Sequence, residues 1–168
     1  SYYAQITERD LDAATDNWRV QPETSSCGYF CDLAPHMLDI QQYLLGNIVE
    51  AHGQAVNQEK LYPAEDMVSG SYVFESNVHG TGIWNFNSGR RLDRTEIVGS
   101  KGSITFATFG NDPIILQKDD TVEEIEASNP VHIQQGLIQT IVNQLLGKGK
   151  CPSTGEDALP TSWVMDKL

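Results

Sequence analysis

Hydrophobic positions recur with the period of an α-helix in residues 27–46. One apolar stripe follows spacings of four, three and four residues: Leu33, Met37, Ile40 and Leu44. A polar stripe has the same spacing one position earlier: Asp32, His36, Asp39 and Tyr43. Residues three and four apart share one face of a helix, so two carboxylates and an imidazole are expected along one edge of it.

Pro35 and Gly46 indicate where this helix begins and ends. Proline has no backbone N–H and disfavours helical geometry in the residue before it. We therefore expect the regular helix to begin near Pro35, with residues 29–34 in a turn or an irregular first segment. A glycine directly after the last apolar positions is typical of a C-cap, and Gly46 stands there.

After Gly46 the hydrophobic pattern becomes strand-like. Short stretches rich in β-branched and aromatic residues follow one another between turn signals: 48–57, 67–75, 78–86, 94–99, 103–108, 114–118 and 121–127. Residues 2–8 have a similar composition, and the acidic and polar residues after them predict a loop to about Asn17. Because no helix separates the later stretches, we expect a mostly antiparallel sheet of about six strands.

The strands place their largest apolar side chains on one face of this sheet. Trp84 and Phe86 occupy alternate positions, and Ile83 falls on the opposite, mixed face. Helices are expected to pack on the face that carries Trp84 and Phe86. The mixed face also holds Val73 and Ile115 among polar residues, and we expect it to mediate self-association.

Two further helices are predicted near the C-terminus. Asn129-Pro130 suits the cap and first position of a helix that Gly147 closes. Thr154 and Asp157 have the spacing of a capping box and predict a helix that runs through Trp163.

Composition indicates an ordinary globular domain. With 168 residues, 39% of them apolar and 20% charged, the chain can bury a core, and we expect residues 1–168 to form one α+β domain. Its 11 basic and 23 acidic residues give a formal net charge of -12, which repels nucleic acid and anionic lipid. No apolar run predicts a membrane span or a signal peptide, so we expect a soluble protein without nucleic-acid or membrane partners.

The three cysteines do not form a recognisable framework. Cys27, Cys31 and Cys151 fit neither a set of disulfides nor a four-cysteine zinc site. We expect packing thiols in a reducing, cytoplasmic compartment, with a redox pair of Cys27 and Cys31 as the minor alternative. A metal site on the polar stripe is disfavoured, because three ligands on successive turns of one helix converge poorly. We therefore predict no metal.

The segment GYFCDLAPHMLDIQQYLLG at 28–46 resembles the start of the C-terminal domain in the Gfo/Idh/MocA family, the glucose-fructose oxidoreductase and inositol dehydrogenase group of NAD(P)-dependent enzymes. The shared pattern is an Asp, a His four residues on, another Asp three later, and a Leu-Leu-Gly end. Further matches follow in order: NWRV at 17–20, GTGIWNF at 80–86, EIVGSKGSITF at 96–106, HIQQGLIQTIVNQLL at 132–146 and CPSTGEDA at 151–158. The resemblance implies a glyceraldehyde-3-phosphate dehydrogenase-like C-terminal domain, the half of a larger enzyme that binds substrate and forms oligomers.

His36 and Asp32 are the candidate catalytic residues. Oxidation of an alcohol by hydride transfer needs a group that removes the hydroxyl proton, and imidazole titrates near neutrality. From the residues alone, an Asp and a His at this spacing are more often a partly exposed helix pair. The resemblance implies that they lie at the substrate pocket, with His36 as general acid/base beside a Lys from a nucleotide-binding domain.

Arg19 and Asp39 are the candidate substrate-binding residues. The guanidinium of Arg19 can bind a substrate oxygen or a cofactor phosphate, and a surface ion pair is the equal alternative. Asp39 either extends the site or makes a structural hydrogen bond, and we favour the structural role.

The sequence has no G-x-G-x-x-G turn that follows a strand, which is the usual device for binding a dinucleotide. The resemblance implies NAD or NADP in the intact enzyme, bound mainly by an N-terminal domain absent here, and no cofactor in this chain alone. It also implies a sugar, polyol or related hydroxyl compound as substrate, and a homodimer or tetramer formed through the open sheet face. A non-catalytic binding or assembly module of the same fold and an NAD-dependent glycoside hydrolase remain as alternatives.

Overall fold

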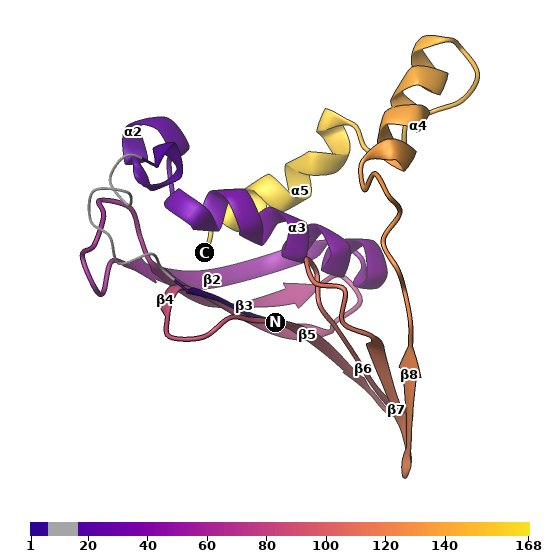
Figure 1. The fold of residues 1–168 in the computed structure, drawn as a ribbon, viewed down its shortest axis with the longest axis horizontal. Coiled ribbons are helices and arrows are strands. Elements are labelled where there is room, and N and C mark those ends of the chain that lie inside the picture. Colours follow the sequence, from indigo (N-terminus) through magenta and orange to yellow (C-terminus); the bar gives the residue numbers. More distant parts are fainter. Residues whose placement is uncertain (7–16) are drawn as a thin grey trace.

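One mixed sheet of eight strands organises the computed structural model, which describes residues 1–6 and 17–168. The strands are β1 (Tyr2–Ile6), β2 (Ile48–Val56), β3 (Met67–Phe74), β4 (His79–Ser88), β5 (Leu92–Gly99), β6 (Gly102–Phe106), β7 (Ile114–Lys118) and β8 (Thr121–Ile125). Their spatial order is β2-β3-β4-β1-β5-β6-β7-β8, and each described neighbouring pair is antiparallel except β1 with β4. The expected α+β architecture with a mostly antiparallel sheet is confirmed (Figure 1).

The sheet has more strands than the six or so that we expected, because the first strand and the last hairpin both join it. β1 inserts between β4 and β5, with Tyr3 opposite Trp84 on one side and Asp93 on the other. The β7–β8 hairpin extends the far edge beyond β6. The expected continuation of the first strand at residues 7–8 and the loop before Asn17 lie outside the described residues.

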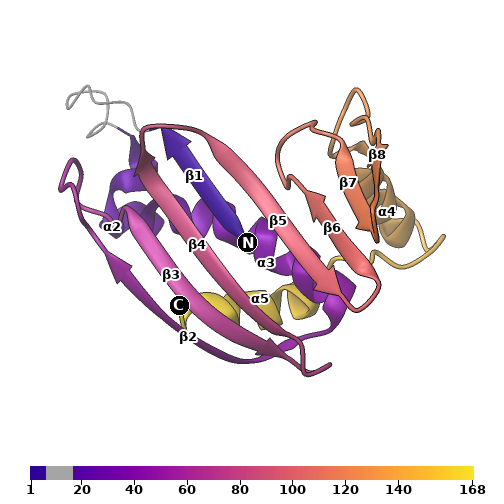
Figure 2. The ribbon, with the colours of Figure 1, turned by 90° about the horizontal axis from the view of Figure 1, so that it is seen from below.

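Helices cover one face of the sheet and leave the other face open. They are η1 (Trp18–Val20), α2 (Pro22–Ser25), α3 (Gly28–Leu45), α4 (Gln135–Leu145) and α5 (Gly155–Met165). Figure 2 shows the open face, with α3 and α5 behind the strands. The core lies between α3 and the centre of the sheet, where large side chains are buried: Phe30, Met37, Leu38, Tyr72, Phe74, Trp84 and Phe86.

Pro35 lies inside α3, so the helix start expected near Pro35 and the irregular segment expected at 29–34 are wrong. A proline in a helix interior costs roughly 3 kcal/mol, because it removes one hydrogen bond and its ring crowds the preceding turn. The apolar face of the first turns offsets this cost. Phe30 is 3% exposed, and its ring packs edge to face on Trp84 with the centroids 5.2 Å apart. Burying one such side chain contributes roughly 1.5–3 kcal/mol.

Glycines mark both ends of α3. Gly28 has a φ of +64°, and a Cβ there would lie 2.8 Å from the Cβ of Ala64, so a larger residue would force the backbones apart. The N–H of Gly28 donates to Ser25 Oγ at 3.3 Å and closes the turn before the helix. Gly46 has a φ of +90°, and its N–H donates to the Gln42 carbonyl. The predicted C-cap is therefore confirmed.

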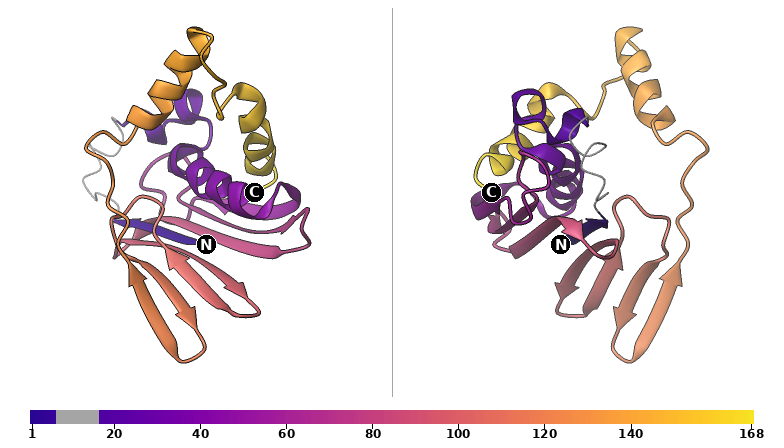
Figure 3. Two further views of the ribbon diagram at one scale, coloured as in Figure 1. Left: turned by 90° about the vertical axis from the view of Figure 1, so that its right-hand side faces the viewer. Right: turned by 60° about the vertical axis from the view of Figure 1, so that its left-hand side comes forward.

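The two C-terminal helices differ in how well the sequence predicts their starts. Thr154 and Asp157 form the predicted capping box at the start of α5. In contrast, α4 begins at Gln135 rather than at Asn129-Pro130, and residues 129–134 connect it to β8. Figure 3 shows α4 standing away from the sheet, and none of its residues is buried. No core contact therefore favours an earlier start.

Cys27 and Cys31 form a disulfide, with their Cα atoms 5.3 Å apart. The expectation of packing thiols is wrong for these two residues, whereas Cys151 is a free, buried thiol. Residues four apart at a helix start are spatial neighbours, so the bond closes only a short loop. The cysteines therefore no longer support the reducing, cytoplasmic compartment that we inferred from them.

Thiol counting tests this bond. In guanidinium without reductant, we expect only Cys151 to react with Ellman's reagent, and all three cysteines to react after reduction. In the Cys27→Ser variant, Cys31 should become reactive before reduction. Three reactive thiols in the unreduced wild-type protein would contradict the assignment.

Candidate functional site

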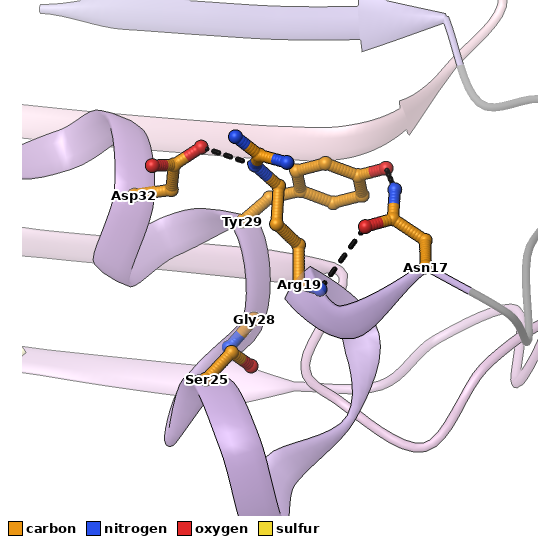
Figure 4. Close-up of polar contacts among 6 residues, drawn as sticks. All are labelled: Asn17, Arg19, Ser25, Gly28, Tyr29 and Asp32. Carbon is orange, nitrogen blue, oxygen red and sulfur yellow. Dashed lines mark hydrogen bonds and ion pairs between the residues drawn. The ribbon is translucent and has the colours of Figure 1, made fainter.

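An ion pair between Arg19 and Asp32 joins η1 to the first turns of α3 (Figure 4). Arg19 Nε donates to Asp32 Oδ2 at 2.6 Å. Asn17 caps η1, because its side-chain oxygen accepts from the Arg19 backbone N–H at 3.0 Å. The Asn17 amide also donates to the Tyr29 hydroxyl at 2.8 Å. These contacts hold η1 against the helix and aim the guanidinium at Asp32.

The ion pair fixes orientation more than it stabilises the fold. The side chains of Arg19 and Asp32 are 37% and 36% exposed, and such pairs contribute about 0–1 kcal/mol. The carboxylate of Asp32 is directed to Arg19, and no hydrogen bond joins it to His36, although α3 includes both of these described residues. The Arg19 guanidinium also lies 4.5 Å from the centre of the Trp18 ring. Of the roles considered for Arg19, the structure displays the ion pair.

His36 lies one turn after Asp32, as predicted, and its side chain is exposed. Its ring packs against Phe109, with centroids 5.7 Å apart and planes at 87°. Within residues 1–6 and 17–168, no hydrogen bond engages the imidazole. Both ring nitrogens can therefore face a ligand.

Asp39 takes part in a hydrogen-bond chain between α3, α5 and β2. The hydroxyl of Thr161 donates to Asp39 Oδ1 at 3.3 Å and accepts from Gln42 Nε2 at 2.8 Å. The side-chain oxygen of Gln42 accepts from the Ile48 N–H at 3.0 Å. Thr161 and Gln42 are buried, while Asp39 is exposed. Asp39 thus has the structural hydrogen bond that we favoured and still presents its carboxylate to solvent.

Two cavities meet at His36 and Asp39. One of 420 Å³ lies between α3 and α5, and one of 930 Å³ lies between α3, strands β5–β7 and the connection 129–134. Both fall within the range of about 300–1,000 Å³ that is common for small-molecule sites. Neither is lined by Arg19 or Asp32. Apolar side chains form much of the larger wall: Ile40, Leu44, Ile97, Ile104, Phe106, Phe109 and Ile114.

Three residues of this region escaped the sequence argument. Phe109 contacts His36, Asp93 binds the segment that carries Phe109, and the Tyr3 ring packs on Phe109 with centroids 5.5 Å apart. Burial raises the pKa of Tyr3, while Arg91 beside its hydroxyl acts in the opposite direction. No local pattern signals these contacts, because they join strands and loops that are distant in the sequence.

The described part of the chain shows no group of three or more His, Cys, Asp or Glu side chains placed to hold a metal ion. Its helices include none that is long and apolar enough to cross a membrane.

Comparison with known sequences decides the family. Residues 2–105, more than half of the chain, match the family described as GFO/IDH/MocA C-terminal domain. The chain belongs to this family. The Gfo/Idh/MocA resemblance of the sequence is thereby confirmed, and the eight-stranded sheet with helices on one face is the fold of such a domain.

Individual relatives agree with this placement. Oxidoreductase P35 of Formosa agariphila is 32% identical over 163 residues, which are 96% of this chain and 50% of that protein. A levoglucosan dehydrogenase in complex with NADH and levoglucosan shares the fold with a TM-score of 0.82 at 16% identity, over 99% of this chain and 54% of that one. Aldose-aldose oxidoreductase from Caulobacter crescentus, complexed with glycerol, shares the fold with a TM-score of 0.76 at 15% identity, over 98% of this chain and 50% of that one. The Gfo/Idh/MocA domain described here spans about half the length of these relatives.

The ion pair at the start of α3 gives a stability prediction. Arg19→Ala should lower the free energy of unfolding by no more than about 1 kcal/mol, because both charges are already partly hydrated. Arg94→Ala is the matched control, since Arg94 makes a similar exposed pair with Glu96 at 2.8 Å. Urea unfolding measures both. A loss well above that of the control would show that Arg19 anchors the fold.

Proposed function

We propose that this chain is the substrate-binding and oligomerisation domain of an NAD(P)-dependent oxidoreductase that acts on a sugar, polyol or related hydroxyl compound. The proposal rests chiefly on His36, whose imidazole borders two cavities and has no hydrogen-bond partner among the described residues. A group that exchanges a proton with a substrate needs at least one ring nitrogen free to reach it. His36 is the general acid/base of the proposed reaction.

The proposed chemistry is the oxidation of a secondary alcohol. His36 takes the hydroxyl proton as the carbon gives up its hydride, and it returns a proton in the reverse direction. NAD(P), when bound, supplies the hydride acceptor. The chain has no glycine-rich phosphate loop, so a separate N-terminal domain would hold the dinucleotide. In this proposal, the domain described here contributes the substrate-binding space, which is the pair of cavities beside His36.

The other candidate residues have supporting roles in this proposal. Asp32 is held by Arg19 one turn from His36 and supplies a fixed negative charge near the reacting group. Arg19 lines neither cavity, so its remaining guanidinium nitrogens can donate only to a substrate oxygen that extends past the cavities toward η1. Asp39, on the wall of both cavities, can accept a hydrogen bond from a substrate hydroxyl.

The relatives support the substrate class. Levoglucosan dehydrogenase and aldose-aldose oxidoreductase are named for carbohydrate substrates, and each shares this fold. Polar side chains form much of the wall of the smaller cavity next to His36, which suits a compound rich in hydroxyl groups.

The decisive experiment is the His36→Ala substitution in the intact enzyme. With levoglucosan and glucose as trial substrates, turnover should fall by about 10² to 10⁴, the range for loss of a general acid/base, while NAD(H) affinity stays near the wild-type value. Asp32→Asn should lower turnover less. His52→Ala is the matched control, because His52 is an exposed histidine on β2 that lines neither of the two cavities.

Wild-type turnover in His36→Ala, with a substrate that the wild-type enzyme oxidises, would contradict the catalytic assignment. The same result would favour a non-catalytic role for this domain.

The open sheet face is the proposed oligomer interface. Ile83 and Val73 lie on this face, half-buried, with Ser69 directly opposite Ile83 on β3. Two such faces can pack across a two-fold axis, so that the same patch serves both subunits. A homodimer or tetramer is therefore proposed.

Sedimentation at micromolar concentration checks this interface. The wild-type chain should sediment as a dimer or larger, and Ile83→Lys should dissociate it, because a lysine would bury an unpaired charge. Leu159→Lys, on α5 in the helix layer, should leave the assembly intact; Leu159 is 64% exposed. A monomeric wild-type chain would contradict the proposal.

A further inference from the structure

The segment between β6 and β7 is anchored by a single carboxylate. Three consecutive backbone N–H groups donate to Asp93 on β5: Thr108 N at 3.0 Å, Phe109 N at 2.6 Å and Gly110 N at 3.3 Å. Hydrogen bonds to a charged acceptor are stronger than those between neutral groups, and successive N–H groups that point one way form a natural cradle for an anion. Here the carboxylate of Asp93 occupies this cradle, so the backbone of residues 108–110 has a defined conformation.

The anchored segment presents one aromatic ring to the proposed site. The Phe109 ring lies between the Tyr3 ring, 5.5 Å away at 75°, and the His36 ring, 5.7 Å away at 87°. Tyr3 is buried and is the register partner of Asp93 in the sheet. The ring of Phe109 therefore packs on the buried Tyr3 of β1 on one side and on the exposed imidazole of His36 on the other.

This contact matters because little else restrains His36. Its side chain is exposed, and across the described residues no hydrogen bond selects one of its rotamers. An aromatic pair in an edge-to-face arrangement is worth about 0.5–1.5 kcal/mol, which is enough to favour one rotamer over another. Phe109 is the ring that the structure places against the imidazole.

We propose that Asp93 and Phe109 are positioning residues for His36: the Asp93 carboxylate holds the 108–110 backbone, and this backbone holds the Phe109 ring that sets the orientation of the imidazole. The effect on catalysis rests on the proposed function of His36. The orientation of the imidazole rests on the contacts alone. The proposal assigns a role to two residues that lie 57 and 73 positions after His36 in the sequence.

The structural part is tested by NMR on the 168-residue chain, with the His36 ring resonances assigned from the His36→Ala variant. Phe109→Leu removes the ring current and should shift these resonances. Asp93→Asn keeps the size of the side chain but loses one of its two acceptor oxygens, and should shift them in the same direction. Asp112→Asn is the matched control, because Asp112 is an exposed carboxylate in the same segment that receives none of the three N–H bonds.

His36 resonances that stay unchanged in Asp93→Asn, while Phe109→Leu shifts them, would remove Asp93 from the proposal. Unchanged resonances in both variants would overturn it. If Asp93→Asn does not fold, Phe109→Leu with Phe109→Tyr as the conservative replacement still decides whether the ring contacts His36.

The catalytic part is tested in the intact enzyme with the same trial sugars. Misplacing a catalytic group by about 1 Å can cost up to about 100-fold in rate, so Phe109→Leu and Asp93→Asn should each lower kcat by about 10- to 100-fold with the KM for NAD(H) unchanged. Phe109→Tyr, which keeps an aromatic ring at this position, should retain most of the wild-type activity. Full activity in Phe109→Leu, combined with an inactive His36→Ala, would overturn the positioning role and leave the general acid/base intact. An active His36→Ala would instead overturn the proposed function, while the NMR result would still decide the contact.

Discussion

The packing of α3 on the centre of the sheet is the constraint on which the rest of the structure depends. Phe30, Met37 and Leu38 are buried against Trp84 and Phe86, and this burial keeps the helix continuous through Pro35. Because one side of α3 is fixed in the core, the polar stripe is held on its other side. The positions of His36 and Asp39 beside the cavities follow from the apolar half of the same helix.

A few polar contacts refine this placement at each end of α3. At the start, Arg19 and Asn17 tie η1 to the helix. Toward its end, the buried amide of Gln42 and the hydroxyl of Thr161 join α3 to β2 and α5. Buried groups of this kind are costly unless they are paired, so they specify one docking arrangement of the helices.

Local features of the fold were predictable because each depends on neighbouring residues. The helical period of α3, the C-cap at Gly46 and the capping box of Thr154 with Asp157 are of this kind. The insertion of β1 between β4 and β5 was not predictable, because strand order depends on pairing between distant segments. The continuity of α3 through Pro35 was missed for a related reason: the local cost of proline is offset by tertiary burial that a local rule does not include.

The candidate site also has features that the sequence predicts and features that depend on the folded structure. The spacing of Asp32, His36 and Asp39 along one helix edge follows from the sequence alone. The pairing of Arg19 with Asp32 does not follow from the sequence, because it requires η1 to be folded against α3. The Asp93 cradle joins positions 15 to 17 residues apart through sheet geometry, and no spacing rule indicates it. Charge and motif therefore identify the candidate reacting groups, while the residues that we propose to orient them emerge only from the fold.

The central claim, that His36 exchanges a proton with a sugar hydroxyl, is tested most directly by a crystal structure of the intact protein with NADH and levoglucosan. The account predicts an imidazole nitrogen of His36 within hydrogen-bonding distance, about 2.6–3.2 Å, of the hydroxyl on the carbon that faces the nicotinamide. A sugar bound with that hydroxyl turned to another acid or base, and with His36 out of reach, would contradict the account.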